Sequence, residues 1–298
     1  MRPRPARAAI GAVLRAAPSL TPRIEKGLWR CFYQLSSRQR RDPGTGFMNY
    51  GYAPLDGCEP DAGRHSNDPD RFARRLYAKV AGAVDLTGQD VLEIGCGRGG
   101  GSAFVFEQFQ PRCLTGIDLA PSAIARCREE QERPGLAFAV GDAEALPFPD
   151  DSFDVVLNVE SSHCYPDVPQ FLKEVRRVLR PGGLFLLADF RHTVLPEGAE
   201  HALVPQEDVS RLRQQLAAAG YRTVVEEDLT PNVVEALRLD SPARRARLES
   251  RVPKPLRRHV VAFAAVEGGA MHAAFAEGRW TYLRFVLRAS QNGGRAGC

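Results

Sequence analysis

A glycine-rich segment at positions 93–100 contains the first residues of the chain whose types and spacing could bind a ligand. It reads Glu-Ile-Gly-Cys-Gly-Arg-Gly-Gly and begins within the short apolar run 91–94. Glycines in such a loop let the backbone approach a ligand closely, and the N-terminus of a following helix attracts negative charge. Gly95, Gly97 and Gly100 have the GxGxxG spacing of nucleotide-binding turns. The segment therefore predicts a nucleotide-binding turn, with a purely structural tight turn as the alternative.

Acidic residues around this turn distinguish between two kinds of nucleotide ligand. Glu93 lies just before the first glycine, where a carboxylate suits a ligand that carries an ammonium and a sulfonium and would repel a pyrophosphate. Asp118 closes the next apolar run and can hold both ribose hydroxyls, while Asp142 follows the run after that and can accept from an adenine amino group. Nicotinamide dinucleotides also require an acid near position 118, but the three acids together favour S-adenosylmethionine.

A histidine and an aspartate form a second set of chemically capable side chains. His163 follows the apolar run 153–159, and Asp189 ends the run 184–188. Because ligands of open parallel sheets bind at the carboxyl ends of the strands, the two side chains can meet at one pocket. An aliphatic hydroxyl can be methylated when a general base with a pKa near neutrality removes its proton. We predict that His163 is this base and that Asp189 fixes its tautomer; a structural histidine at a strand end is the alternative.

The elements that must position these residues alternate along the chain. The pattern predicts strands at 91–94, 113–117, 136–140, 153–159, 184–188, 222–228 and 280–288, and helices at 69–82, 121–130, 171–179 and 206–220. Such alternation indicates a parallel sheet with helices on both faces. Residues 231–277 look helical and interrupt the alternation. We expect this insertion either to roof a hydrophobic acceptor pocket through Val261, Phe263, Met271 and Phe275 or merely to pack onto the sheet.

Composition excludes several classes of protein. Of the 298 residues, 44% are hydrophobic and 26% are charged, which is ordinary for a globular protein and unlike a disordered or fibrous one. The seven cysteines contain no CxxC pair, so we expect neither a disulfide framework nor a metal site, and reduced thiols indicate a cytoplasmic protein. We expect no membrane span, because no apolar stretch reaches the roughly 18 residues that a helix needs to cross a bilayer.

The net charge of +4 is unevenly distributed. Residues 1–41 contain ten Arg and Lys against one acid, Glu25, which gives +9 there and leaves −5 for the remainder. A basic arm attracts anionic surfaces, so it could make weak contact with a membrane surface; a solvated arginine-rich surface is the favoured alternative. Part of the arm, residues 8–35, looks helical. We expect no nucleic-acid partner, and the oligomeric state stays open.

Five segments of the chain match the pattern of one enzyme class. They are 47–52 (Phe-Met-Asn-Tyr-Gly-Tyr), the glycine-rich turn, 141–148 (Gly-Asp-Ala-Glu-Ala-Leu-Pro-Phe), 158–166 (Asn-Val-Glu-Ser-Ser-His-Cys-Tyr-Pro) and 178–183 (Val-Leu-Arg-Pro-Gly-Gly). With the glycine-rich turn, 141–148, Asp154-Val155-Val156 and 178–183 the chain resembles class I methyltransferases over about residues 75–230 and 280–290. With 47–52, the glycine-rich turn and 158–166 it more narrowly resembles the phthiotriol and phenolphthiotriol dimycocerosate methyltransferases of mycobacteria, and more distantly the O-methyltransferases of macrolide and other polyketide pathways.

The resemblance implies a fold and an activity. The fold is α/β, a doubly wound seven-stranded Rossmann-like methyltransferase sheet with N-terminal helices in residues 1–74 and a helical lid at 231–277 within a domain of residues 75–298. The activity is S-adenosylmethionine-dependent O-methylation of a hydroxyl on a hydrophobic polyketide or lipid-like natural product. The alternatives are C-, N- or carboxyl methylation, a non-methylating cyclase of the same fold, and a nicotinamide oxidoreductase.

The resemblance also implies roles for individual residues. In such enzymes the segment that matches Tyr50 and Tyr52 folds over the methyl donor, where an aromatic face stabilises a sulfonium by about 0.5–2 kcal/mol. The alternative is that both tyrosines pack the N-terminal helices onto the sheet. Similar O-methyltransferases also carry a His and Asp pair at places matching His163 and Asp189. The residues that we expect to bind the donor are Tyr50, Tyr52, Glu93, Gly95, Cys96, Gly97, Gly99, Asp118, Leu119, Asp142, Ala143 and Asn158.

Overall fold

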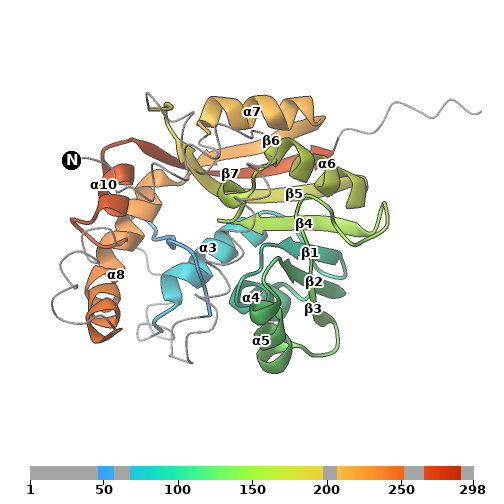
Figure 1. The fold of residues 1–298 in the computed structure, drawn as a ribbon, viewed down its shortest axis with the longest axis horizontal. Coiled ribbons are helices and arrows are strands. Elements are labelled where there is room, and N and C mark those ends of the chain that lie inside the picture. The colour runs from blue at the N-terminus through green and yellow to red at the C-terminus, as the bar shows by residue number, and fades with distance from the viewer. Residues whose placement is uncertain (1–45, 57–67, 197–206, 252–264, 290–298) are drawn as a thin grey trace, which may run out of the picture.

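One seven-stranded sheet forms the centre of the protein (Figure 1). The computed structural model describes residues 46–56, 68–196, 207–251 and 265–289. The strand order is β3-β2-β1-β4-β5-β7-β6; β7 runs antiparallel to both neighbours, and the other pairs are parallel. The strands are β1 (Asp90–Ile94), β2 (Cys113–Asp118), β3 (Leu136–Val140), β4 (Phe153–Val159), β5 (Leu179–His192), β6 (Tyr221–Asp228) and β7 (Trp280–Ala289). The predicted seven-stranded Rossmann-like fold is confirmed, with one antiparallel strand in place of an entirely parallel sheet.

Helices cover both faces of the sheet, as the alternating pattern predicts. Four of them, α3, α4, α5 and α8, bury apolar side chains against one face, and α6 and α7 bury theirs against the other. The helices are α3 (Arg71–Ala81), α4 (Gly100–Phe109), α5 (Pro121–Gln131), the short 3₁₀ helix η2 (Ser162–Cys164), α6 (Val168–Val178), α7 (Val209–Ala218), α8 (Thr230–Arg251) and α10 (Ala270–Ala276). In α6 the side chain of Asp167 accepts the Gln170 amide at 2.9 Å and caps the helix, while Phe171 and Val175 on one stripe are fully buried.

The fifth strand is longer than the sequence predicts. The sequence predicts a helix over 171–179 and a strand over 184–188, with the turn-forming Pro181-Gly182-Gly183 between them, whereas β5 already begins at Leu179 and continues to His192. A register shift against β4 accommodates the turn-like residues, because Phe153 pairs with Leu179 but Val155 pairs with Leu184. At its other end β5 is extended by the long antiparallel partner β7. Asp189 therefore lies inside the strand and does not end it.

The helical insertion lies between β6 and β7. Its described part consists of α8 and α10, which form one end of the molecule (Figure 1). The predicted roof residues Val261 and Phe263 lie outside the described residues, as do the basic arm 1–41, the predicted helix 8–35 and Cys31, Cys58 and Cys298. The boundary between segments 1–74 and 75–298 stays a prediction. In the part of the chain that the structure describes, the four cysteines are free, and no helix is long and apolar enough to cross a membrane.

A cluster of charges joins the amino-terminal ends of the central strands. Asp90, at the start of β1, accepts from Arg112 Nε and from Arg180 Nη2, both at 2.8 Å, and Arg180 also bonds Asp154 at 2.7 Å. The hydrogen bonds from Arg112, with those from Cys113 and Arg180, lower the pKa of Asp90 despite partial burial. This cluster ties β1, β4 and β5 to the segment before β2 at the edge opposite to the predicted site.

We expect Asp90→Asn to lower the free energy of unfolding by about 1–2 kcal/mol at neutral pH, since bonds to a charged acceptor are lost while the arginines remain solvated. A carboxyl with a lowered pKa stabilises the fold above its unfolded value of about 3.9, and that contribution disappears as the pH falls through the folded value. The difference between the two proteins should therefore shrink below about pH 4. Urea unfolding at several pH values measures this. The same change at the exposed Asp85 is the control, and equal losses in both variants would contradict the role of the cluster.

Candidate active site

The turn between β1 and α4 brings backbone to the edge of a cavity. Gly95 and Gly97 have φ values of +76° and +54°, which favour glycine, and a Cβ at Gly95 would collide with the Ser161 side chain. The amide of Gly97 donates to Asp118 Oδ2 at 3.0 Å, and the amide of Ala120 donates to Asp118 Oδ1 at 2.9 Å. The sequence thus forms the turn with left-handed glycines and uses the acid at the end of β2 to hold it in place.

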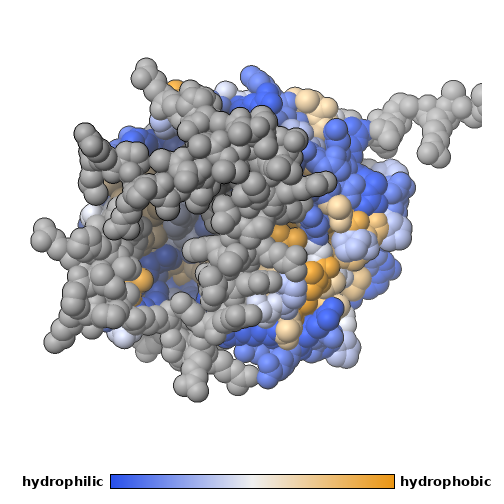
Figure 2. All heavy atoms as spheres, viewed as in Figure 1, coloured by the Kyte–Doolittle hydropathy of each residue, from blue (hydrophilic) through white to orange (hydrophobic). Residues whose placement is uncertain are grey.

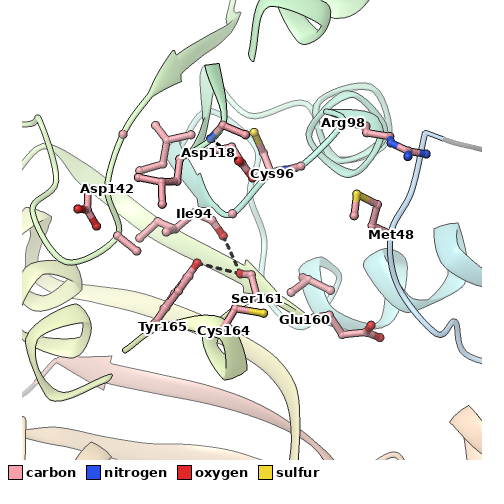
Figure 3. Close-up of a pocket in the computed structure, with 18 of the residues that line it drawn as sticks. Met48, Ile94, Cys96, Arg98, Asp118, Asp142, Glu160, Ser161, Cys164 and Tyr165 are labelled. Carbon is pink, nitrogen blue, oxygen red and sulfur yellow. Dashed lines mark hydrogen bonds between the residues drawn. The ribbon is translucent and has the colours of Figure 1, made fainter. Parts of the chain in front are cut away.

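Seven of the residues predicted to bind the donor line this cavity. They are Gly95, Cys96, Gly97, Asp118, Leu119, Asp142 and Ala143. They come from the carboxyl ends of β1, β2 and β3, and in Figure 3 Asp118 and Asp142 lie on one side of the cavity and Met48, Arg98 and Glu160 on the other. The structure therefore brings together residues that are far apart in the sequence, at the sheet edge where ligands of open α/β sheets bind.

Glu93 lies behind the cavity and does not line it. Its side chain is fully buried, and it accepts a hydrogen bond from Tyr77 Oη at 2.6 Å and another from Ser102 Oγ. Burial raises the pKa of this carboxyl, against the effect of the two donors. Because its oxygens are engaged by α3 and α4, the carboxyl fastens these helices to β1, and Tyr77 lines the cavity in its place. The predicted contact between Glu93 and the donor has no counterpart in this geometry.

Two further predicted residues also support the cavity from outside. Gly99 precedes α4 at φ +76°, and its amide donates to the carbonyl of the lining residue Cys96 at 2.9 Å. The buried Asn158 amide donates to the Ile94 carbonyl at 3.0 Å and to Ser161 Oγ at 2.8 Å. Both residues hold the lining in place without being part of it.

The predicted aromatic segment divides between two places. Tyr52 lies near Lys79, with the Lys79 ammonium 5.8 Å from the Tyr52 ring centroid. It lines neither this cavity nor the second, adjacent one. Tyr50 packs against Phe190 and Phe275 with ring centroids 5.5 and 5.3 Å apart, and it lines a second, adjacent cavity. The neighbours of these tyrosines, Met48 and Asn49, line both cavities.

The cavity beside the glycine turn, called the donor cavity from here on, has an acidic lining, as a cationic nucleoside requires. Its lining contains four acids, Asp118, Asp142, Glu144 and Glu160, and one strong base, Arg98. Burial raises the pKa of Asp118, which the two backbone amides partly oppose. A dinucleotide pyrophosphate would be repelled by this lining, whereas a ligand with ribose hydroxyls, an ammonium and a sulfonium fits it. In the described ranges, no group of three or more His, Cys, Asp or Glu side chains is arranged to hold a metal ion.

The second cavity contains the predicted base. His163 lies in η2 and lines this cavity together with Phe190 and Tyr50. The lining also includes residues of the insertion, namely Asp240, Arg244, Arg247, Leu248, Ala265 and Val266. Four residues line both cavities: Met48, Asn49, Arg98 and Glu160. The two cavities therefore adjoin, and His163 stands in the one that the glycine turn does not border.

His163 and Asp189 are in direct contact. The distance from His163 Nδ1 to Asp189 Oδ1 is 2.8 Å, and Asp189 Oδ2 also accepts the His163 amide at 2.9 Å and Ser162 Oγ at 2.6 Å. Burial opposes ionisation of both groups, but their mutual attraction outweighs it, with Arg191 also acting on Asp189. As a result the pKa of His163 lies well above its usual value and the pKa of Asp189 lies below its own. The contact with Asp189 therefore favours the protonated form of His163 beside an ionised carboxylate.

Sequence reasoning missed several lining residues at the end of β4. Glu160, Ser161, Cys164 and Tyr165 all line the donor cavity. Their signal was available in part, because they follow the fourth predicted strand as Asp118 and Asp142 follow the second and third. The same edge rule that identified Asp118 applies to them.

Known proteins match the chain over most of its length. Residues 92–187 match the family model described as a methyltransferase domain. The phthiotriol/phenolphthiotriol dimycocerosates methyltransferase of Mycobacterium tuberculosis (strain ATCC 25618 / H37Rv) is 36% identical over 88% of this chain and 92% of its own length. The fatty-acid O-methyltransferase of Mycolicibacterium smegmatis is 37% identical over 75% of this chain and 76% of its own length.

A solved structure shares the fold at low identity. Geranyl diphosphate C-methyltransferase from Streptomyces coelicolor A3(2), in complex with Mg²⁺, geranyl diphosphate and S-adenosyl-L-homocysteine, has a TM-score of 0.65 at 16% identity. The match covers 88% of this chain and 98% of that one. The methyl donor of the present protein is S-adenosylmethionine, in agreement with the charge of its donor cavity. Since identity of 36% extends over 88% of its residues, the chain belongs to the family of S-adenosylmethionine-dependent O-methyltransferases that includes the phthiotriol/phenolphthiotriol dimycocerosates methyltransferases.

Proposed function

We propose that the protein methylates a hydroxyl oxygen of a hydrophobic, lipid-like acceptor, with His163 as the general base. The observation that carries this proposal is the position of His163 in a cavity that adjoins the donor cavity. Relatives named for phthiotriol dimycocerosates and for fatty acids support a lipid-like acceptor. When bound, S-adenosylmethionine supplies a methyl group on a positively charged sulfur.

The residues around His163 account for the proton transfer. Its Nδ1 is bound to Asp189, so Nε2 is the nitrogen left to accept the hydroxyl proton. Asp189 stabilises the imidazolium that results, as the acid of a catalytic triad does. Phe190 lies 4.4 Å from the imidazole ring between centroids and limits access of water on that side. Orientation and exclusion of water then supply much of the rate enhancement.

Apolar side chains of the second cavity suit a lipid-like chain. Phe47, Phe72, Phe190, Leu248 and Val266 are among its lining residues. Because Leu248 and Val266 belong to the insertion, we infer that the insertion roofs the acceptor site, which is one of the two alternatives that the sequence left open. Of the residues named for this roof, Met271 and Phe275 contact Tyr50 and do not line the cavity. Cytoplasmic location, weak contact of the basic arm 1–41 with a membrane surface and the absence of a nucleic-acid partner are further parts of the proposal, supported by composition alone.

A carboxyl acceptor is the second candidate. A carboxylate needs no base to attack the methyl group, and a protonated His163 could bind it by charge. The raised pKa of His163 and the fatty-acid O-methyltransferase at 37% identity both favour this candidate. The two candidates differ in the protonation state of His163 that they require.

Donor binding should depend on Asp118. We expect Asp118→Ala to weaken S-adenosylmethionine binding about 10–100-fold, because hydrogen bonds to a carboxylate contribute about 1.5–3 kcal/mol each and water replaces part of them. Isothermal titration of the folded variant measures the dissociation constant. Asp85→Ala, which removes an exposed acid at the opposite edge of the sheet, is the control and should bind as the wild type does. Unchanged affinity in Asp118→Ala would remove this residue from the site.

The dependence of kcat on pH distinguishes the two acceptors. With a hydroxyl acceptor the active form has neutral His163, so kcat should rise with pH and level off only above the raised pKa. With a carboxyl acceptor the active form has protonated His163, so activity should fall through the same pKa. For a hydroxyl acceptor, His163→Ala should lower kcat by about 10²–10⁴ and leave donor binding intact. A long-chain secondary alcohol and a long-chain fatty acid are the acceptors to compare.

Asp189→Asn separates orientation from charge in the same assay. It should cost less than His163→Ala if Asp189 only orients the ring, and as much if the amide locks the wrong tautomer. If His163→Ala keeps the turnover and pH profile of the wild type with both acceptors, the base assignment is wrong.

The roof has its own test. Leu248→Trp should fill part of the acceptor cavity and raise KM for a long-chain acceptor several-fold, while the dissociation constant of the donor stays unchanged. Leu239→Trp is the matched control, because Leu239 lies on the same helix with its side chain exposed. Equal effects of the two changes, or a parallel loss of donor binding, would argue against a roof over the acceptor alone.

A further inference from the structure

Glu160 stands at the boundary between the two cavities. Methyl transfer requires the donor methyl group and the acceptor oxygen to meet, so the reacting atoms belong where the cavities adjoin. Of the four residues that line both, Met48, Asn49, Arg98 and Glu160, only Glu160 has a carboxyl group. Figure 3 places it on the side of the donor cavity where Met48 and Arg98 lie, away from Asp142.

The backbone holds Glu160 in an unfavourable conformation. Its φ is +48°, and its amide donates to the Ala188 carbonyl at 2.8 Å directly after β4. A residue with a side chain in this region costs about 1–3 kcal/mol, and such residues cluster at functional sites. The conformation keeps the glutamate at the cavity boundary, where a glycine would relieve the strain but lack a carboxyl.

The surroundings of Glu160 disfavour its charge in the free protein. Its Oε1 accepts the Tyr50 amide at 2.8 Å. Burial, assisted by the negative charge of Asp189, raises its pKa to about 8, against the effects of the Tyr50 amide, of charged His163 and of the Tyr282 hydroxyl. The phenols of Tyr50 and Tyr77 also lie within range of its charge. At neutral pH most molecules of the free protein therefore carry the neutral acid.

We propose that Glu160 is the counter-ion of the donor sulfonium, losing its proton to solvent when S-adenosylmethionine binds and placing a carboxylate beside the positive sulfur. No bond to the donor is formed, and the proton leaves through the open cavity. The inference rests on the donor site described above. Because S-adenosylhomocysteine has an uncharged sulfur, its binding does not stabilise the ionised form of Glu160. Glu160 thus makes the site prefer the donor over the demethylated product.

The sign of the pH dependence follows from this linkage. Below about pH 8 donor binding must displace a proton from Glu160, so donor affinity should rise with pH and level off above that value. Product affinity should show no such contribution. The ligands' own α-amino groups also titrate near pH 8, but they contribute equally in wild type and variant, so the comparison between proteins isolates Glu160.

The test is isothermal titration of the donor and of S-adenosylhomocysteine into wild type and Glu160→Gln between about pH 6.5 and 8.5. Glutamine keeps an oxygen for the Tyr50 amide. Relative to the variant, the wild type should gain about 25-fold in donor affinity across this range, while product affinity stays alike in both. Asp85→Asn, which removes an exposed carboxyl that lines neither cavity, is the control and should keep the wild-type pattern.

A second measurement does not depend on the variant folding. Donor titrations of wild type at about pH 7 in two buffers of different ionisation enthalpy should reveal close to one proton released, against none for the product beyond its amino group. The inference is overturned if the donor-to-product affinity ratio is the same in wild type and Glu160→Gln at every pH, if both ligands weaken equally, or if no proton is released. Failure of the wild type to bind the donor at all would instead overturn the donor site, and the inference with it.

Discussion

A fully buried carboxylate must find donors for its charge, and Asp189 finds them on β5 and η2. It accepts from Ser162 Oγ, from the amide and ring of His163 and from the amide of Phe190, with Arg191 at 3.3 Å. An unpaired charge at this depth would be strongly destabilising. Hydrogen bonds to the charged Asp189 therefore hold η2 to β5. Moving His163 away from Asp189 would leave the buried carboxylate with fewer donors and destabilise the fold. The His163–Asp189 pair therefore also fixes one wall of the second cavity.

Much of the fold follows from buried apolar runs and the ends of those runs. The predicted bounds of 136–140 and 153–159 coincide with β3 and β4, because turn residues delimit both strands. The predicted start of β5 was wrong, because Pro181-Gly182-Gly183 has the composition of a turn. Only the pairing with β4 shows that these residues form a bulge within the strand. The antiparallel direction of β7 depends on tertiary pairing, which the alternation of helices and strands does not specify.

The site was predictable where the rule of strand ends suffices. Asp118 and Asp142 follow strands, and both line the donor cavity. Glu93 does not line this cavity. Every residue of β1 is buried, so no alternation of polar and apolar residues in the sequence indicates toward which face of the sheet a side chain points. The sequence analysis did not predict Glu160 as a site residue, for a different reason. A left-handed conformation at a residue other than glycine has no sequence signal, since it arises from the surrounding structure.

The segment around Tyr50 links the two cavities mechanically. Arg244 of α8 donates to the Tyr50 carbonyl at 3.1 Å and bonds Asp240 at 2.6 Å, while the Tyr50 amide donates to Glu160. A change in the charge of Glu160 therefore acts on the backbone of Tyr50, which Arg244 of α8 also contacts. The Tyr50 ring packs on Phe190, which in turn lies against His163, so the same segment also contacts the wall that contains His163. Glu160, α8 and the wall around His163 thus all contact the short segment at Tyr50. These contacts give a physical route by which a ligand in one cavity could alter the affinity of the other cavity for its ligand.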